Sequence, residues 1–450
     1  MTKTTRTLQD IIRKKGFQAA SVLIFNSISW YFLLFIFLTD AINQLHVAYS
    51  SVLIIFGLHY VAIAGSAFLG NRLVEKIGRN NLLSLWIILG VCASALMIFL
   101  SSSAVPVICA VSLLLGLSLG LGFPSCLAFF GDNSTTERRG LIGGVTFALT
   151  FVAITVAGFL STLTNFTTIV VGLSLWRFLG LLFFLFLKTG ENNAQTKVSY
   201  SNIIREKSFL LYFIPWMIFC VVNFFQAPFF DTRLQQQYIG TNLSYIISLG
   251  EFGIGGISMF VGGYLSDHIG RKRVIIAAYA LVGVGYALLS FASQNRLVFY
   301  SYILLDGIAW GMFFLMFILV IWGDLAQARI KNRYYLIGCM PFIISSYLMP
   351  IVKPYTGDIP LFASFSFASF FLFLAVIPLM VAPETLPEKV MRDHDLKSYA
   401  EKALKEAMRE ANKTQRKDTD ISGLKNKESQ EETDQSPEDE EARRLAEKYY

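Results

Sequence analysis

Long apolar stretches alternate with short polar ones between residues 19 and 382, and this alternation predicts the secondary structure. A helix needs about 20 apolar residues to cross the hydrocarbon core of a bilayer. Twelve stretches reach that length, with ends defined to within a few residues: 19–42, 48–69, 81–101, 104–130, 141–162, 167–187, 209–230, 241–265, 273–294, 297–323, 333–352 and 360–382. The pattern therefore predicts an all-α integral membrane protein with twelve transmembrane helices.

Composition agrees with this assignment. Apolar residues make up 54% of the chain and charged residues only 15%, outside the range typical of soluble domains. The first stretch follows Arg13, Lys14 and Lys15, but it is too long for a signal-peptide core and lacks a small-residue cleavage site. We expect it to remain in the protein as a helix. All five cysteines lie inside apolar stretches without a CxxC pair, so neither a disulfide framework nor a metal site is expected.

Basic residues gather in alternate loops. Twenty Lys and Arg residues precede the first stretch or lie in every second loop, whereas the opposite loops hold only Arg233, Arg296 and Lys353. We therefore expect a multi-pass protein of the cell membrane. The positive-inside rule predicts that both of its termini lie in the cytoplasm. The net charge of +7 reflects this topology, and no nucleic-acid partner is expected.

The chain repeats itself with an offset of 192 residues. GNRLVEKIGRNN (70–81) and GGYLSDHIGRKR (262–273) share their shape, and the first six apolar stretches shifted by 192 fall on the last six. We expect two pseudo-symmetric six-helix halves, 1–187 and 209–387, joined by a cytoplasmic linker, 188–208. Parallel halves of this kind are a recurring transporter plan, with the substrate site between them.

The last part of the chain, 388–450, is a charged cytoplasmic tail without an apolar stretch. Apolar residues keep helical spacing from Leu396 to Ala411, which predicts one amphipathic helix. The segment 418–441 is rich in charge and poor in apolar residues, and we expect it to lack fixed structure.

Two loop motifs carry a family resemblance. Gly263-x3-Asp267-x2-Gly270-Arg271-Lys272 resembles the signature loop between helices 2 and 3 of the major facilitator superfamily. Its first-half copy keeps Gly78 and Arg79 but has Asn71 for glycine and Glu75 for aspartate.

Further motifs extend the resemblance to about residues 10–387. Asp132-x2-Thr135-x3-Arg139-Gly140 is similar to the family's loop after helix 4, with Thr135 where proline is usual, and Gly323-Asp324 repeats its start. Pro383-Glu384-Thr385 is similar to the PET that closes many sugar and organic-ion porters of the family.

The resemblance implies a latch on the cytoplasmic side. Glycines at both ends of the loop, Gly263 and Gly270, would permit a tight turn. An acid at a neighbouring helix N-terminus, or paired with arginine, would hold two helices together. Alternatively, the loop serves only to set topology through its basic residues. The expected gating residues are Glu75, Gly78, Arg79, Asp132, Arg139, Gly263, Asp267, Gly270, Arg271 and Asp324.

Four ionisable residues lie at membrane depth, where such groups are costly and point to function: His59, Arg177, Glu251 and Asp306. His59 and Glu251 are separated by 192 residues and occupy equivalent places. His59 is either a cavity residue or a hydrogen-bonded packing residue. Burial disfavours a charged carboxylate, so Glu251 could carry a proton, or it could serve as a structural hydrogen-bond donor. Asp306 is a further candidate for substrate or proton binding.

Arg177 has two alternative positions. It lies in the middle of an apolar stretch, yet Trp176-Arg177-Phe178 also resembles the WRF that begins helix 6 of the family at the outer surface. The polar residues Asn26, Asn223 and Gln226 either line a cavity or bond neighbouring helices, and the sequence does not separate these roles.

The combined pattern predicts a secondary active transporter of a small organic solute that works by alternating access and is coupled to protons. No G-x4-GK[ST] loop for a nucleotide occurs, so ATP-driven pumping is not expected. We expect a monomer in the lipid bilayer, with no cofactor. The alternative is a receptor on the same fold that signals through its C-terminal tail. We find no cluster of polar residues with catalytic spacing in the sequence, so we do not expect an enzyme.

Overall fold

The computed structural model describes residues 14–45, 47–101, 104–187, 199–230, 241–326, 330–388, 390–392, 396, 408 and 437–449. Of residues 101, 241–251, 437–439, 446 and 449 it describes the backbone alone. These described residues are nearly all helical, and they contain no β-strand. By internal packing the chain divides into two compact units, Met1–Pro387 and Glu388–Tyr450.

Eleven helical segments among the described residues of the first unit are long and apolar enough to cross a membrane. They are α2 (Lys15–Gln44), α3 (Tyr49–Ile77), α4 (Arg79–Leu96) with η1 (Met97–Ser101), α5 (Val105–Gly120) with α6 (Phe123–Asn133), η2 (Thr136–Arg138) with α7 (Arg139–Ser161), α8 (Phe166–Leu187), α10 (Lys207–Phe229), α13 (Arg271–Ala292), α14 (Arg296–Phe314) with η4 (Leu315–Val320) and α15 (Ile321–Leu325), α16 (Lys331–Ser345) with α17 (Leu348–Val352) and η5 (Lys353–Tyr355), and α18 (Leu361–Leu374) with α19 (Val376–Val381). The chain is therefore a multi-pass membrane protein, as its apolar stretches predict.

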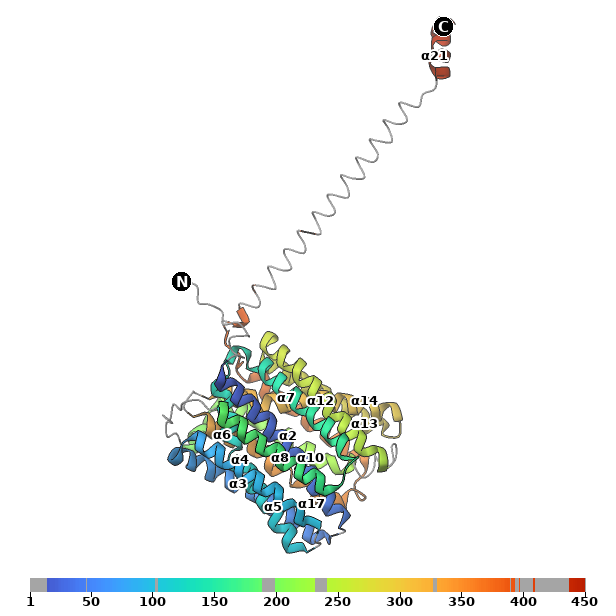
Figure 1. Cartoon of the computed structure of the whole chain (residues 1–450). Coiled ribbons are helices and arrows are strands. Elements are labelled where there is room, and N and C mark those ends of the chain that lie inside the picture. Colours follow the sequence, from blue (N-terminus) through green and yellow to red (C-terminus); the bar gives the residue numbers. More distant parts are fainter. Residues whose placement is uncertain are drawn as a thin grey trace. The chain divides into compact units, whose positions relative to one another are not determined.

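The structure describes two further helices in the first unit. α12 (Thr241–Ile269) has 29 residues, of which 241–251 are described by their backbone alone, and it is not among the eleven. The short α9 (Tyr200–Arg205) precedes α10 and lies within the predicted linker. Figure 1 shows the long helices of this unit side by side in one bundle, with α7 next to α12.

Proline explains three of the places where a predicted stretch is divided between two helices. Proline has no N–H to donate to the carbonyl four residues earlier. α5 ends at Gly120, four residues before Pro124, and the helix is broken at Ser346, four residues before Pro350. In the same way α18 ends at Leu374, four residues before Pro378.

Aromatic side chains fill the interior of the bundle. Trp30, Trp86, Trp216 and Trp322 are among the largest fully buried side chains. Many outward-facing residues are also large and apolar, such as Phe291. An apolar outer surface is expected for helices that face lipid.

Single glycines connect two pairs of helices. Gly78 joins α3 to α4 with φ 80°, and Gly270 joins α12 to α13 with φ 103°. Only glycine adopts such angles readily, which explains why both copies of the motif keep it. The prediction that Gly263 also forms the turn was wrong, because Gly263 lies inside α12 and contacts α7 instead.

The second unit contains α21 (Pro437–Tyr449). The expectation that 418–441 lacks fixed structure was wrong for its last five residues. Pro437 suits the first helical position, and the acidic residues after it lie at the positive helix N-terminus. Glu440 and Arg444 are spaced as an i,i+4 pair, which adds support. The amphipathic helix predicted between Leu396 and Ala411 lies almost wholly outside the described residues.

Candidate functional site

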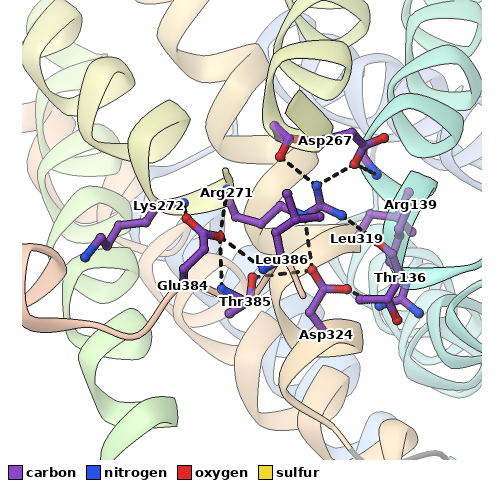
Figure 2. A network of polar contacts seen from close by, with 12 residues as sticks. Thr136, Arg139, Asp267, Arg271, Lys272, Leu319, Asp324, Glu384, Thr385 and Leu386 are labelled. Atoms are coloured by element: carbon purple, nitrogen blue, oxygen red, sulfur yellow. Dashed lines mark hydrogen bonds and ion pairs between the residues drawn. The ribbon is translucent and has the colours of Figure 1, made fainter. Parts of the chain in front are cut away.

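A buried ion cluster lies at the end of the bundle where α12 turns into α13 (Figure 2). We call it the Asp324 cluster: Arg139, Asp267, Arg271, Asp324 and Glu384. The Asp324 carboxylate accepts hydrogen bonds from Arg139 Nη1 and, at 3.1 Å, from Arg271 Nε. The side chains of Arg139 and Asp324 are only 2% and 0% exposed. Asp324 therefore ties α7 and α13 to α15 inside the protein.

Asp267 attaches α12 to the first turn of α7. Its carboxylate accepts from the backbone N–H of Gly140 at 3.0 Å and of Leu141 at 2.7 Å, and also from Arg271 Nη1. The first N–H groups of a helix have no partner within that helix and carry partial positive charge. Asp267 thus accepts hydrogen bonds from otherwise unpaired N–H groups at the N-terminus of α7, a helix that lies more than a hundred residues away in the sequence.

Arg271 and Glu384 complete this cluster. The Arg271 guanidinium donates to the carbonyl oxygens of Ser266 and Thr136, each at 2.7 Å. The Glu384 carboxylate accepts from the backbone N–H of Arg271 at 2.8 Å and of Lys272 at 3.1 Å. Glu384 therefore caps the N-terminus of α13. Figure 2 shows Glu384, Arg271 and Asp324 converging at this point.

A second cluster repeats this arrangement near the turn at Gly78. We call it the Asp132 cluster: Glu75, Arg79, Asp132, Lys331 and Arg333. Asp132 accepts from Arg79 Nη1 at 2.8 Å and pairs with Lys331 Nζ at 2.9 Å, and Arg333 donates to Glu75 at 2.8 Å. The carboxylates are more exposed than in the Asp324 cluster, with side-chain values of 26% for Asp132 and 30% for Glu75.

The two clusters correspond through the 192-residue offset. Asp324 binds Arg271 and Arg139, and Asp132 binds the equivalent pair, Arg79 and Lys331. The gating residues expected from the sequence thus fall into two groups, with Gly78 and Gly270 at the turns beside them.

Sequence reasoning missed three members of these clusters. Glu384 was visible as the acid of the Pro383-Glu384-Thr385 motif, and Lys331 as the equivalent of Arg139. Nothing in the sequence singled out Arg333.

Glycines line the contact between α7 and α12, which we call the α7/α12 seam. A Cβ on Gly140 would lie 2.7 Å from the carbonyl oxygen of Gly263. A Cβ on Gly144 would lie 2.5 Å from the carbonyl oxygen of Met259. The two helix backbones therefore touch directly, and this approach brings Asp267 within reach of the α7 backbone.

A cavity of 430 Å³ lies between the helices away from the clusters. Its wall includes Ile28 to Asp40 of α2, Tyr60 and Ile63 of α3, and Phe342 to Met349 of the α16–α17 region. Along α2 the lining ends at Asp40, four residues before the helix ends at Gln44. Asp40 is a carboxylate that sequence reasoning missed because it lies near the end of its apolar stretch.

A second cavity of 270 Å³ adjoins the first. The two share Phe252, Trp310 and Met349 in their walls. Two residues proposed from the sequence, Asn223 and Asp306, line this second cavity together. Tyr302 forms a hydrogen bond with the Asp306 carboxyl group.

His59 is fully buried behind the cavity wall. Its Nδ1 lies 2.9 Å from the carbonyl oxygen of Ser112, which can only accept, so Nδ1 carries a proton. Its Nε2 lies 2.8 Å from the hydroxyl of Tyr31, and Tyr31 lines the first cavity. His59 therefore bonds α3 to α5 and reaches the cavity only through Tyr31.

Arg177 is fully buried within α8, so the structure shows the buried alternative and not the surface one. Nη1 donates to Asn26 Oδ1 at 3.0 Å and to Ser27 Oγ at 2.6 Å. The guanidinium lies 4.5 Å from the ring centroids of both Trp30 and Trp86. Cation–π contact with these rings takes the place of a counter-ion. Asn26 and Arg177 thus bond neighbouring helices.

The remaining candidates from the sequence are Gln226 and Glu251. Gln226 is buried and exchanges two hydrogen bonds with Ser364, which joins α10 to α18. Glu251 belongs to α12, but its side chain lies outside the described residues. In the described part of the chain no group of three or more His, Cys, Asp or Glu side chains could hold a metal ion.

Comparison with known proteins identifies the family and the fold. The family model described as Major Facilitator Superfamily matches residues 19–321. Among solved structures, the crystal structure of the human organic anion transporter MFSD10 (TETRAN) aligns with a TM-score of 0.60 and 14% identity, over 83% of this chain and 100% of that one. At this identity the likeness shows the fold alone. No curated protein matches the sequence, and neither similarity supports a signalling receptor.

Proposed function

The chain belongs to the Major Facilitator Superfamily and is a membrane transporter, and from this premise we propose that it moves a small organic solute by proton-coupled alternating access. The observation that carries the proposal is an asymmetry between the two ends of the bundle. Ion clusters close one end, and the 430 Å³ cavity extends along α2 toward the other.

The proposed architecture has twelve spanning helices in two six-helix halves, 1–187 and 209–387, joined by 188–208. α12 is the helix that raises the count from eleven to twelve. The offset of 192 supports the halves, because Gly78 and Gly270 occupy equivalent turns. In each cluster the aspartate pairs with one basic residue of its own half and one of the other.

The proposed orientation places both termini, the clusters and the 388–450 tail in the cytoplasm, as the distribution of basic residues indicates. The described state is then closed to the cytoplasm. A tag at Tyr450 that is reached by antibody only after cells are permeabilised would agree with this orientation. Labelling of intact cells would contradict it.

Spin-label distances test alternating access without knowledge of the solute. Arg72 and Arg273 are exposed sites at the clustered end, one in each half, and Leu163 and Leu297 are exposed sites at the other end. In a cysteine-free background, nitroxide pairs at 72/273 and 163/297 should each show two distance populations that change in opposite directions. The 72/163 pair lies within one half and should stay constant, which makes it the control.

Asp267→Asn sharpens this test, because it removes the charge that holds α12 to α7. Hydrogen bonds to a charged group contribute about 1.5–3 kcal/mol, enough to shift a two-state equilibrium about tenfold or more. The variant should increase the population with the longer 72/273 distance and lower transport, at near-normal abundance in the membrane. Unchanged distances would leave Asp267 with a role in topology alone.

Proton coupling is proposed for Glu251, supported by its place in the middle of a spanning stretch and next to Phe252, which lines both cavities. A flux screen of sugars, organic acids and amines would first supply the solute. Glu251→Gln should then abolish accumulation driven by a pH gradient while exchange down the solute gradient persists. Accumulation that survives in Glu251→Gln but not in Glu251→Ala would show a structural residue.

A further inference from the structure

One face of α14 combines a carboxylate with aromatic rings. Tyr302, Asp306 and Trp310 are spaced four residues apart, so they lie above one another on the helix, and all three line the second cavity. Asp306 is half-buried in that wall. The carboxylate and the indole thus face the same space.

Aromatic rings continue this wall into the first cavity. Trp310 stacks on Phe314 with ring centroids 4.9 Å apart and planes 8° apart. Phe252 packs edge-on against Trp310 on one side and against Phe32 on the other. The faces of aromatic rings carry negative electrostatic potential and attract cations within about 6 Å.

The charge in the two cavities has one sign. Asp40 lines the first cavity and Asp306 the second, and the described lining residues include no Lys, Arg or His. Among the described residues neither carboxylate forms an ion pair. The three buried arginines among the described residues, Arg139, Arg177 and Arg271, are engaged elsewhere. A carboxylate that lines a cavity without a paired cation favours the binding of a cationic ligand.

We propose that the transported solute is an organic monocation with an aromatic or branched apolar body, such as a quaternary or protonated amine. Its charged nitrogen lies beside Asp306, and its apolar body lies against Trp310 and Phe252 toward the first cavity. Cavities of 270 and 430 Å³ suit a small ligand of this kind. This inference rests on the proposed transport function and names the substrate class of the same site.

Three probes of similar size separate charge from shape: trimethylanilinium, its neutral isostere tert-butylbenzene, and the anion benzenesulfonate. Binding would be measured by calorimetry on the full-length protein in nanodiscs, with empty nanodiscs as the reference. Trimethylanilinium should bind about tenfold more tightly than either other probe, because its charge pairs with a carboxylate shielded from water. Equal binding of the isostere, or tighter binding of the anion, would overturn the inference.

Variants then assign the site. Asp306→Asn should weaken trimethylanilinium binding about tenfold and leave tert-butylbenzene unaffected, and Asp306→Glu should restore most of the loss. Asp358→Asn makes the same charge change at an exposed position and serves as the matched control. Unchanged affinity in Asp306→Asn, with normal elution on size exclusion, would contradict the assignment.

Flux in proteoliposomes distinguishes failure of this inference from failure of the proposed function. Uptake of trimethylanilinium that depends on Asp306 supports both. Binding that depends on Asp306 without any flux supports the site and contradicts transport of this class. Flux of benzenesulfonate that is indifferent to Asp306→Asn supports a transporter and overturns the cationic substrate.

Discussion

Two contacts between the proposed halves differ in how closely their helices approach. At the α7/α12 seam the backbones touch through glycines, whereas α3 meets α16 and α17 through side chains, a contact we call the α3/α16 seam. There Tyr347 donates to the carbonyl oxygen of Leu53 at 2.9 Å, and Tyr49 donates to that of Pro350 at 3.1 Å. The offset of 192 equates the two seams, yet Gly140, Gly144 and Gly263 correspond to Asn332, Leu336 and Asn71.

This difference in residue size decides what each acid can reach. Asp267 approaches closely enough to accept two backbone N–H groups of α7. Among the described residues, its counterpart Glu75 pairs with the side chain of Arg333, and it remains 30% exposed. At the first seam the acid is therefore held by buried bonds to the α7 backbone, and at the other by a partly exposed ion pair of similar length.

The cavity follows the looser seam. Tyr60, Ile63, Phe342 and Ser346 of the α3/α16 seam line the first cavity, whereas Phe252 is its only described lining residue from the α7/α12 seam. We infer that the α7/α12 seam stays closed more firmly and that the α3/α16 seam separates more readily. The predictions below test this difference in pairs of equivalent substitutions.

The largest contrast is expected between Asp324→Asn and Asp132→Asn. Loss of Asp324 leaves Arg139 and Arg271 buried without their shared counter-ion, and breaking a buried pair in this way costs about 3–5 kcal/mol. Loss of Asp132 affects two partly exposed pairs, with Arg79 and Lys331, each worth about 0–1 kcal/mol. The midpoint of thermal unfolding in one detergent should therefore fall much further for Asp324→Asn.

If Asp324→Asn does not accumulate, a double variant keeps the comparison measurable. Replacing both Arg139 and Asp324 by leucine removes one buried charge of each sign, leaves Arg271 paired with Asp267, and should recover part of the lost stability. Similar midpoints for the two single asparagine variants would show that burial does not distinguish the clusters.

A smaller contrast is expected between Gly140→Ala and Asn332→Ala. The added methyl group would lie 2.7 Å from the Gly263 carbonyl oxygen, so the backbones must move apart. Overpacking of this kind costs about 1–3 kcal/mol. Asn332 makes only long contacts, 3.4 Å from Arg79 Nη2 and from Ser125 Oγ, so its loss should matter less. Unfolding midpoints check the ranking, and a greater loss for Asn332→Ala would contradict the close seam.

The sequence predicted the helical membrane fold well because apolar length and charge distribution report directly on the bilayer. It also identified the turns at Gly78 and Gly270, since a positive φ restricts the residue type. The break before Pro124 follows from a missing N–H, but Pro215, Pro228 and Pro341 lie inside continuous helices, so a proline alone did not predict a break.

The role of each polar residue was harder to predict. Asn26 and Gln226 bond neighbouring helices while Asn223 lines a cavity, although all three lie in similar apolar surroundings. In a membrane the outer face is as apolar as the interior, so hydropathy does not reveal how a helix is rotated. Glu384 acts across 113 residues on the N-terminus of α13, and such a contact depends on the packing of the whole unit.

The smallest effect is expected for the Glu75–Arg333 pair, and its salt dependence carries the information. Glu75→Gln, Arg333→Gln and the double variant form a cycle whose coupling should be about 0.2–1 kcal/mol, as for exposed ion pairs. At about 1 M salt the screening length falls to about 3 Å, so this coupling should vanish. The same cycle on Asp267 and Arg271 should keep its coupling, because water and ions do not reach that pair. If the Glu75–Arg333 coupling is as large as that of Asp267 and Arg271, and does not change with salt, both seams are held alike. The exposure of the Glu75–Arg333 pair would then not explain why the α3/α16 seam is looser.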